Sequence, residues 1–231
     1  MRLATWNCHH GSVTDRLRDL RQIPEFTPDV VALQECSRPD LPEREVNWRG
    51  SYEHKGLAVS VVGEGWAGNA IPLPPDAPMS VLPIWVTGPV NFTVVGVWTH
   101  EVPSYTQDLL KGLVAIKPLL PAGPLVVMGD FNNHPRWDNP ATPMRNHATI
   151  VRTLEDEFGL VSAYHHFHGI EHGRDRNPTH YFMFDEARPF HIDYVFAPKE
   201  WAEQIARVEV GSFEDWRSSD HRPMLVQVDV P

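Results

Sequence analysis

A set of polar side chains in this sequence has the chemistry to bind a divalent cation and a phosphate group. Its members are Asn7, Glu35, His100, Asp130, Asn132, Asp193, Asp220 and His221. Carboxylate and amide oxygens are the hard ligands that Mg²⁺ and Mn²⁺ prefer, and imidazoles bind phosphate oxygens or move protons near neutral pH. Together these groups would suit metal-assisted attack on a phosphate ester. Spacing alone does not prove that they converge, so the elements that carry them matter.

The segment LVVMGDFNNHP, residues 125–135, shows how these groups are presented. Its first four residues are apolar and predict a buried strand, and Gly129 lets the backbone turn sharply where the strand ends. Asp130 and Asn132 follow at the position where open α/β sheets place their chemistry. A Gly-Asp pair after a strand also makes ordinary turns, so this segment needs support from the rest of the chain.

Other apolar runs present polar residues in the same way. They are residues 2–6 with Asn7, residues 29–34 with Glu35 and residues 92–99 with His100. A short helix capped by Thr14 or Asp15 follows the first run, and an amphipathic helix at residues 105–120 follows the last. Two strand–helix–strand units, residues 2–34 and 92–129, are therefore predicted, and their shared plan suggests two related halves that face each other.

The remaining patterns predict further strands, one more long helix and two polar loops. The strands are residues 56–62, 79–87, 190–196 and 225–230, the helix is residues 147–158, and the loops are residues 37–49 and 217–223. Asp193 is the single charged residue of its strand, and a buried carboxylate there needs a partner. Asp220 and His221 lie in the last loop.

A second group of histidines stands apart from these strand ends. Its members, His165, His166, His168 and His172, fall in a predicted loop. They show no recognised zinc-ligand spacing and no accompanying cysteines, so we favour a loop on the substrate side over a zinc site.

Length and composition limit the class of protein. The 231 residues contain no polar or low-complexity linker, which favours one domain over residues 1–231. The apolar runs are strand-sized and no secretory signal opens the chain, so we expect a cytoplasmic protein without membrane association, whose Cys8 and Cys36 are buried free thiols. A formal net charge of −10 disfavours bulk electrostatic binding of long nucleic acids. It does not exclude a nuclease, because bound divalent ions would reverse the local field.

Five motifs, in this order, resemble those of the endonuclease/exonuclease/phosphatase superfamily, which includes exonuclease III, the apurinic endonucleases and pancreatic deoxyribonuclease. They are ATWN (residues 4–7), LQE (33–35), GDFN (129–132), HIDY (191–194) and SDHRP (219–223). The resemblance covers essentially the whole chain. It implies an α/β (α+β) fold, a four-layer α/β/β/α sandwich in which two facing mixed β-sheets carry helices outside. The site would lie where the strand ends of both sheets meet.

The resemblance also implies a metal site. Glu35 resembles the principal metal carboxylate, with Asn7 and Asp220 as direct or water-mediated ligands of Mg²⁺ or Mn²⁺.

The remaining site residues resemble the family's catalytic groups. Asp130 resembles the residue that orients and deprotonates the attacking water, and Asn132 resembles its positioning neighbour. His221 resembles the imidazole that binds a phosphate oxygen, and Asp193 the carboxylate that fixes its tautomer and favours the cation. His100 matches a strand-end position where members place a donor to the scissile phosphate.

These implications favour a divalent-metal-dependent phosphodiesterase, first of all a nuclease acting on DNA or RNA by in-line water attack. A phosphatase or phosphodiesterase of a small phosphorylated metabolite is the alternative, which the acidic charge favours. A catalytically silent binding module on the same fold is the third possibility. We expect a monomer whose partner is a phosphate-ester substrate, with nucleic acid as the first candidate.

Overall fold

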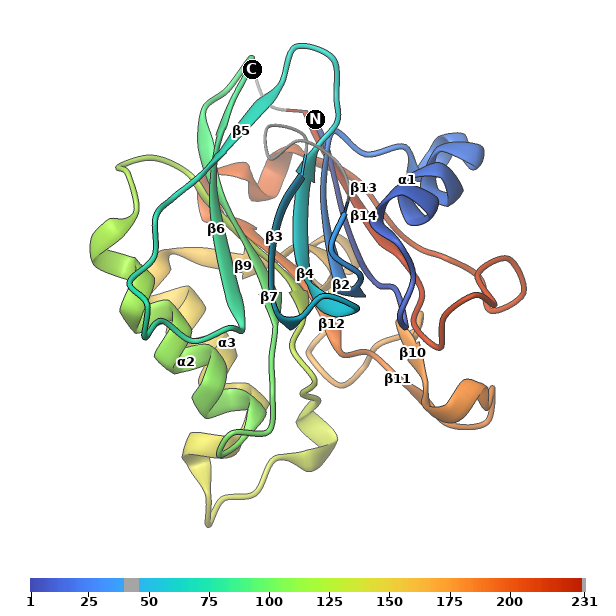
Figure 1. Cartoon of the computed structure of the whole chain (residues 1–231). Coiled ribbons are helices and arrows are strands. Elements are labelled where there is room, and N and C mark those ends of the chain that lie inside the picture. The colour runs from blue at the N-terminus through green and yellow to red at the C-terminus, as the bar shows by residue number, and fades with distance from the viewer. Residues whose placement is uncertain (40–45, 230–231) are drawn as a thin grey trace.

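Two six-stranded sheets form the centre of the computed structural model, which describes residues 1–39 and 46–229 (Figure 1). The first sheet contains, in spatial order, β13 (Ile205–Val210), β14 (Met224–Val228), β1 (Arg2–Asn7), β2 (Val30–Cys36), β4 (Lys55–Val61) and β3 (Val46–Tyr52). The second contains β5 (Ala67–Ala70), β6 (Val81–Thr87), β7 (Phe92–Trp98), β8 (Leu125–Asp130), β12 (Asp193–Pro198) and β9 (Leu160–Ser162). A short ribbon of β10 (His180–Tyr181) and β11 (Pro189–Phe190) stands beside them.

The three long helices cover the outer faces of the sheets, and the short fourth one packs against the core between them. The α-helices are α1 (Val13–Gln22), α2 (Tyr105–Ile116), α3 (His147–Phe158) and α4 (Ala163–His168). Short 3₁₀ turns are η1 (Pro24–Phe26), η2 (Lys117–Leu119), η3 (Pro135–Trp137), η4 (Pro143–Arg145), η5 (Phe182–Phe184) and η6 (Lys199–Gln204). In Figure 1, α1 lies on the side of the first sheet, and α2 and α3 lie on the side of the second. This is the predicted α/β/β/α sandwich.

Alternation along the strands fills both faces of each sheet. Val30 and Ala32 of β2 pack in the core between the sheets, whereas Val31 and Leu33 pack with the buried face of α1. In the second sheet, the side chain of Val127 packs toward α2 and α3, while its neighbours pack between the sheets. Burial on both faces explains why these strands appear as continuous apolar runs in the sequence.

The two predicted strand–helix–strand units are present. β1 and β2 pair in parallel with α1 between them in the chain, and β7 and β8 pair in parallel with α2 between them. The remaining strand pairs of both sheets are antiparallel, so both sheets are mixed. Because β1 and β8 contact each other across the sandwich, the polar residues at their carboxyl ends come together.

Two parts of the predicted loops form regular structure instead. The predicted loop at residues 37–49 overlaps edge strand β3, which begins at Val46. Most side chains of β3 are half exposed, so its sequence does not show the apolar alternation of a strand. Residues 40–45 of the predicted loop lie outside the described residues. His165, His166 and His168 lie in helix α4, which ends at Gly169 in the left-handed conformation. This six-residue helix is too short to show helical periodicity in the sequence.

Two other boundaries differ from the prediction for local reasons. Ser12 caps α1, because its hydroxyl accepts a hydrogen bond from the Asp15 backbone N–H, so neither Thr14 nor Asp15 is the cap. The predicted strand at residues 190–196 is divided between β11 and β12. The backbone N–H groups of Ile192 and Asp193 donate to the Thr179 hydroxyl instead of continuing one ladder.

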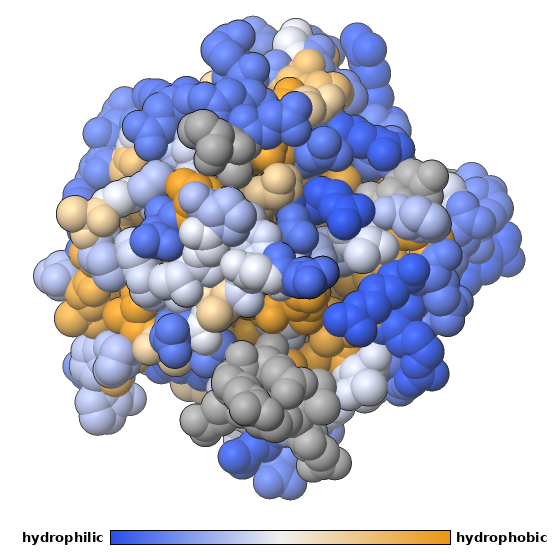
Figure 2. All heavy atoms as spheres, turned by 90° about the horizontal axis from the view of Figure 1, so that it is seen from above, coloured by the Kyte–Doolittle hydropathy of each residue, from blue (hydrophilic) through white to orange (hydrophobic). Residues whose placement is uncertain are grey.

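Figure 2 shows the end of the molecule where both termini lie. Hydrophilic residues cover much of this end, and apolar residues appear in separate patches. β1 begins here, so its polar carboxyl end lies at the opposite end of the sandwich. Among the described residues, no helix combines the length and apolar character needed to cross a membrane.

Candidate active site

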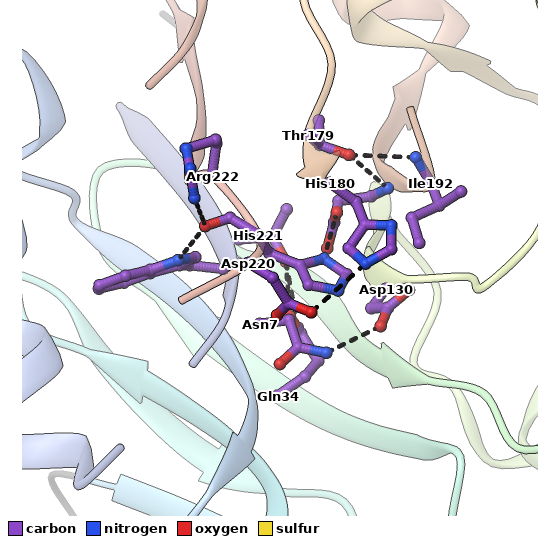
Figure 3. Close-up of polar contacts among 12 residues, drawn as sticks. Asn7, Gln34, Asp130, Thr179, His180, Ile192, Asp220, His221 and Arg222 are labelled. Atoms are coloured by element: carbon purple, nitrogen blue, oxygen red, sulfur yellow. Dashed lines mark hydrogen bonds and ion pairs between the residues drawn. The ribbon is translucent and has the colours of Figure 1, made fainter. Parts of the chain in front are cut away.

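A cavity of about 440 Å³ opens where the strand ends of both sheets meet. Most of the predicted site residues line it, namely Asn7, Glu35, Asp130, Asn132, Asp220 and His221. Figure 3 shows Asn7, Asp130, His180, Asp220 and His221 directed toward one another from different elements. The convergence that spacing could not establish is therefore present in the fold.

Asp130 is held at this cavity by amide groups from both sheets. Its carboxylate accepts a hydrogen bond from Asn7 Nδ2 at 2.9 Å, across the sandwich, and others from the backbone N–H and Nδ2 of Asn132 at 2.8 and 3.0 Å. Burial and the neighbouring charge of Asp193 raise the pKa of Asp130 to about 7. A fixed carboxylate with a pKa near neutrality has the properties of a general base.

Backbone strain marks the same place. Glu35 and Asn132 adopt left-handed φ values of 56° and 47°, and His9 and His10 are left-handed as well. Residues other than glycine hold this conformation only when the surrounding structure enforces it, and such residues gather at functional sites. Both Glu35 and Asn132 line the cavity.

His221 and Asp193 form a buried pair. His221 Nδ1 lies 2.8 Å from Asp193 Oδ2, so the charged residue of β12 has the partner that its burial requires. Burial alone lowers the pKa of His221, but the charges of Asp193 and Asp130 outweigh it and raise this pKa to about 9. The imidazole is therefore cationic at neutral pH, with Nε2 free of the Asp193 contact.

Asp220 lies between two imidazoles. Its carboxylate oxygens are 3.4 Å from His9 Nδ1 and 3.5 Å from His180 Nε2. Burial raises the pKa of Asp220, but the contact with His180 and the charge of His221 outweigh it and lower the pKa to about 2. Sequence reasoning missed His180, whose only signal was an imidazole in an otherwise aromatic run.

Glu35 faces a cation that the sequence did not reveal. Lys55 Nζ lies 3.0 Å from Glu35 Oε2, and His10 Nε2 lies 3.9 Å from the same oxygen. No local pattern around Lys55 indicates this contact, because β2 and β4 pair only in the folded chain. The Lys55 ammonium group thus places a positive charge directly beside the Glu35 carboxylate.

The donor set around the cavity fits a divalent cation. Glu35 and Asp220 supply carboxylates and Asn7 an amide oxygen, which are hard ligands. Within residues 1–39 and 46–229, two sets of three His or acidic side chains bring their ligand atoms within 4.8 Å of one another: His180, Asp220 and His221, and Asp130, Asp193 and His221. Glu35 belongs to neither set.

His100 does not line this cavity. Its backbone N–H and its Nδ1 lie 2.8 and 3.5 Å from Asp108 Oδ2, and its ring packs against Trp98. The side chain lines a neighbouring cavity of about 310 Å³ together with Lys55. The role of phosphate donor therefore stays a prediction for His100, whose chain neighbour Thr99 bonds to Asp130 and Asn132 through its backbone.

One wall of the cavity is apolar and was not predicted. It consists of Trp137, Phe182, Phe190 and Ile192, and the guanidinium of Arg188 lies 4.2 Å from the centre of the Phe182 ring. Phe182 and Phe190 belong to the segment of β10, η5 and β11, and Trp137 follows the β8 motif. The cavity lining therefore combines carboxylate, amide and imidazole groups with aromatic side chains.

The second histidine group lies outside the cavity lining. His165 bonds to Asp175 at 2.7 Å through Nε2, and its ring stacks on that of His172 with the ring centres 3.5 Å apart. His166 faces Glu203 instead. In the described part of the chain, these histidines form no set with metal-ligand spacing, and they do not line the cavity, contrary to the substrate-side loop that we favoured.

The comparisons with known proteins agree with this geometry. The model of the Endonuclease/Exonuclease/phosphatase family matches residues 4–221. The chain belongs to this family. Family members are phosphoesterase hydrolases, so this member is an enzyme of that class. No match was found among curated proteins.

Solved structures share the family fold over the full length of this member. An AP endonuclease from Archaeoglobus fulgidus is 19% identical, with 100% of each chain covered and a TM-score of 0.69. The 3′ phosphatase NExo from Neisseria, bound to product DNA hairpin, is 20% identical with the same coverage and a TM-score of 0.67. The AP endonuclease LMAP from Leishmania major is 14% identical, with 100% of this chain and 88% of that chain covered and a TM-score of 0.72.

Proposed function

We propose that this protein is a nuclease that hydrolyses phosphodiester bonds with Mg²⁺ or Mn²⁺. The observation that carries the proposal is the shared cavity of about 440 Å³, where a carboxylate base, an imidazolium and an apolar wall face one another. The carboxylate base and the imidazolium would act on the phosphate, and the apolar wall would contact a sugar or a nucleobase. The DNA-bound 3′ phosphatase among the structural neighbours is in keeping with a nucleic acid substrate.

Asp130 is the proposed general base. It orients the attacking water and takes its proton, which a pKa of about 7 allows near neutral pH. Asn7 and Asn132 fix the carboxylate, so the water meets it in one orientation.

His221 is the proposed phosphate-binding cation. Its charge would stabilise the phosphate oxygens as attack builds up negative charge, and Asp193 holds the ring with its Nε2 side free. Glu35, Asn7 and Asp220 would hold the divalent cation, which supplies Lewis-acid stabilisation of the same charge.

The apolar wall supports a nucleotide over a phosphate group alone. Aromatic rings stack on nucleobases at about 1–3 kcal/mol per base, and Arg188 adds a cation next to this surface. These side chains favour a substrate that carries a planar ring as well as a phosphate.

A small phosphorylated metabolite is the second candidate substrate. The net charge of −10 favours it, because a protein that holds long nucleic acids usually presents a basic surface. A cavity of about 440 Å³ is also within the size range of small-molecule sites.

One substrate panel distinguishes these candidates. Purified protein with Mg²⁺ or Mn²⁺ is offered duplex DNA, abasic duplex, single-stranded DNA, RNA, inositol phosphates and a generic phosphodiester. We expect cleavage of at least one nucleic acid, lost by at least about a hundredfold in Asp130→Ala and retained in Asp156→Ala, a matched change on the exposed face of α3. Hydrolysis of the small esters alone would exclude the nuclease, and no hydrolysis of any compound would favour the silent binding module.

The cytoplasmic location and the monomeric state belong to the same proposal. Cys8 and Cys36 are buried free thiols, as predicted, and unpaired thiols suit a reducing compartment. Size-exclusion chromatography with light scattering would test the monomer, which a mass near 26.3 kDa would support.

A further inference from the structure

The carboxylate of Asp220 is flanked by imidazoles at an unusual distance. His9 Nδ1 and His180 Nε2 lie 3.4 and 3.5 Å from its two oxygens, one on each side. Hydrogen bonds between nitrogen and a charged oxygen are normally about 2.7–2.9 Å long, so neither contact is an optimal one. Two donors that share one divalent ion at about 2.1 Å lie roughly 3.0–3.4 Å apart, which is close to the observed spacing.

Backbone contacts fix the imidazole of His180 beside this carboxylate. His180 forms an antiparallel bridge with His221, the Tyr181 N–H donates to the Asp220 carbonyl at 2.8 Å, and the Arg222 N–H donates to the Thr179 carbonyl. The short β10 segment is thus tied on both sides of His180 to residues 220–222. Figure 3 shows the His180 ring directed at the Asp220 carboxylate from this segment.

The His180 ring has no other polar use among the described residues. The side chain belongs to a residue only 8% exposed, and its Nδ1 is buried without a hydrogen-bond partner. Its other neighbours are rings, those of His221, Phe182 and Phe190. The ring therefore presents one polar atom, Nε2, to one polar group, the Asp220 carboxylate.

We propose that His180 Nε2 is a direct ligand of a divalent cation bound at Asp220, with His9 Nδ1 at the mouth of the same site. The inference rests on the proposed function, since it adds an imidazole nitrogen to the oxygen ligands Glu35, Asn7 and Asp220 proposed for its cation. A site with an imidazole nitrogen favours first-row transition ions over Mg²⁺, which is bound almost entirely through carboxylates and water. The enzyme would bind Mn²⁺ and Co²⁺ more tightly than Mg²⁺.

Binding of Mn²⁺ to the full chain without substrate tests the ligand. Mn²⁺ affinity is measured by electron paramagnetic resonance titration, and a bound imidazole is detected by ¹⁴N modulation of the electron spin echo. We expect His180→Phe, which keeps a ring among aromatic neighbours, to weaken Mn²⁺ binding at least about tenfold and Mg²⁺ binding less than about twofold. The ¹⁴N modulation should fall in this variant and persist in His54→Phe, a matched change at an exposed histidine.

Other results would overturn the ligand assignment. Unchanged Mn²⁺ affinity and ¹⁴N modulation in a His180→Phe protein with native circular dichroism would exclude His180 as a ligand, as would a wild type that binds Mg²⁺ as tightly as Mn²⁺. Should His180→Phe not fold, His180→Gln replaces it, with the same readouts and the same criteria.

The proposed function can fail separately. If the substrate panel shows no hydrolysis while the ¹⁴N signal depends on His180, the function is wrong and the ligand assignment stands. If nucleic acid is cleaved and the ¹⁴N signal does not depend on His180, the proposed function stands and the ligand assignment is wrong.

Discussion

Asp193 shows how much the site depends on single buried groups. One of its oxygens contacts His221, and the other, Oδ1, has no hydrogen-bond partner among the described residues. A fully buried carboxylate with half of its acceptors unused costs folding free energy. Asp193 raises the pKa of His221 and fixes the orientation of its ring, so its burial serves the neighbouring imidazole.

Replacing Asp193 by Asn should separate orientation from charge. Asp193→Asn removes the charge that raises the pKa of His221, so this pKa should fall, and kcat on the active substrate should fall at least about a hundredfold. The ¹⁵N chemical shifts of the imidazole report the pKa, and initial rates report kcat. Activity within about twofold of wild type would contradict the role of Asp193, and Asp156→Asn is the matched control.

At the scale of elements, the parallel strands β7 and β8 depend on one glycine. Gly129 has a φ of 153°, and a Cβ there would lie 1.9 Å from the Val97 carbonyl oxygen of the paired strand. Another side chain would force β7 and β8 apart directly before Asp130. The sharp turn expected of Gly129 from the sequence is wrong, because β8 continues through Gly129 to Asp130 and Gly129 pairs with both Val97 and Tyr194. The glycine is needed for the close approach of two backbones.

Gly129→Ala should therefore be far more costly than an ordinary glycine change. We expect a loss of at least about 2 kcal/mol in the free energy of unfolding, measured by urea denaturation with tryptophan fluorescence. Gly65→Ala is the matched control, because Gly65 also has a positive φ, of 79°, but a Cβ there meets nothing within 4 Å. Equal losses in the two variants would mean that strain alone, and not the contact with Val97, sets the cost.

At the scale of the whole molecule, buried histidines couple folding to pH. Burial lowers the pKa of His147 to about 3 and that of His191 to about 4, and it is also the main cause that lowers the pKa of His172. Below about pH 6.5 the unfolded chain binds protons that the folded chain does not bind, so each group reduces stability as pH falls, by about 1.4 kcal/mol per pH unit. The raised pKa of Asp130 acts in the opposite direction.

The contribution of one histidine to the pH dependence of stability can be measured by comparing variants. Between pH 6.5 and pH 4, the free energy of unfolding of His147→Gln should depend on pH less steeply than that of wild type, by about 1.4 kcal/mol per pH unit. Urea denaturation at several pH values gives both slopes. His54→Gln, at an exposed position, should keep the wild-type slope, and equal slopes for His147→Gln and wild type would contradict the prediction.

The sequence by itself determined the apolar strands at the centres of the sheets, the two parallel units and the polar residues at their ends. Strands buried on both faces need continuous apolar runs, and the runs around residues 30 and 126 carry this signal locally, as does the period of α3. Edge strand β3 and helix α4 lack such a signal, because one is half exposed and the other spans a turn and a half.

Only the tertiary structure decided which side chains face one another at the site. Lys55 reaches Glu35 and His180 reaches Asp220 through strand pairing, and His100 turns to Asp108 instead of the cavity. Asn7 meets Asp130 over a separation of 123 residues. Contacts between distant residues depend on how the two sheets pack and leave no periodic trace in the sequence, so a strand end can be predicted from its neighbours but its partner cannot.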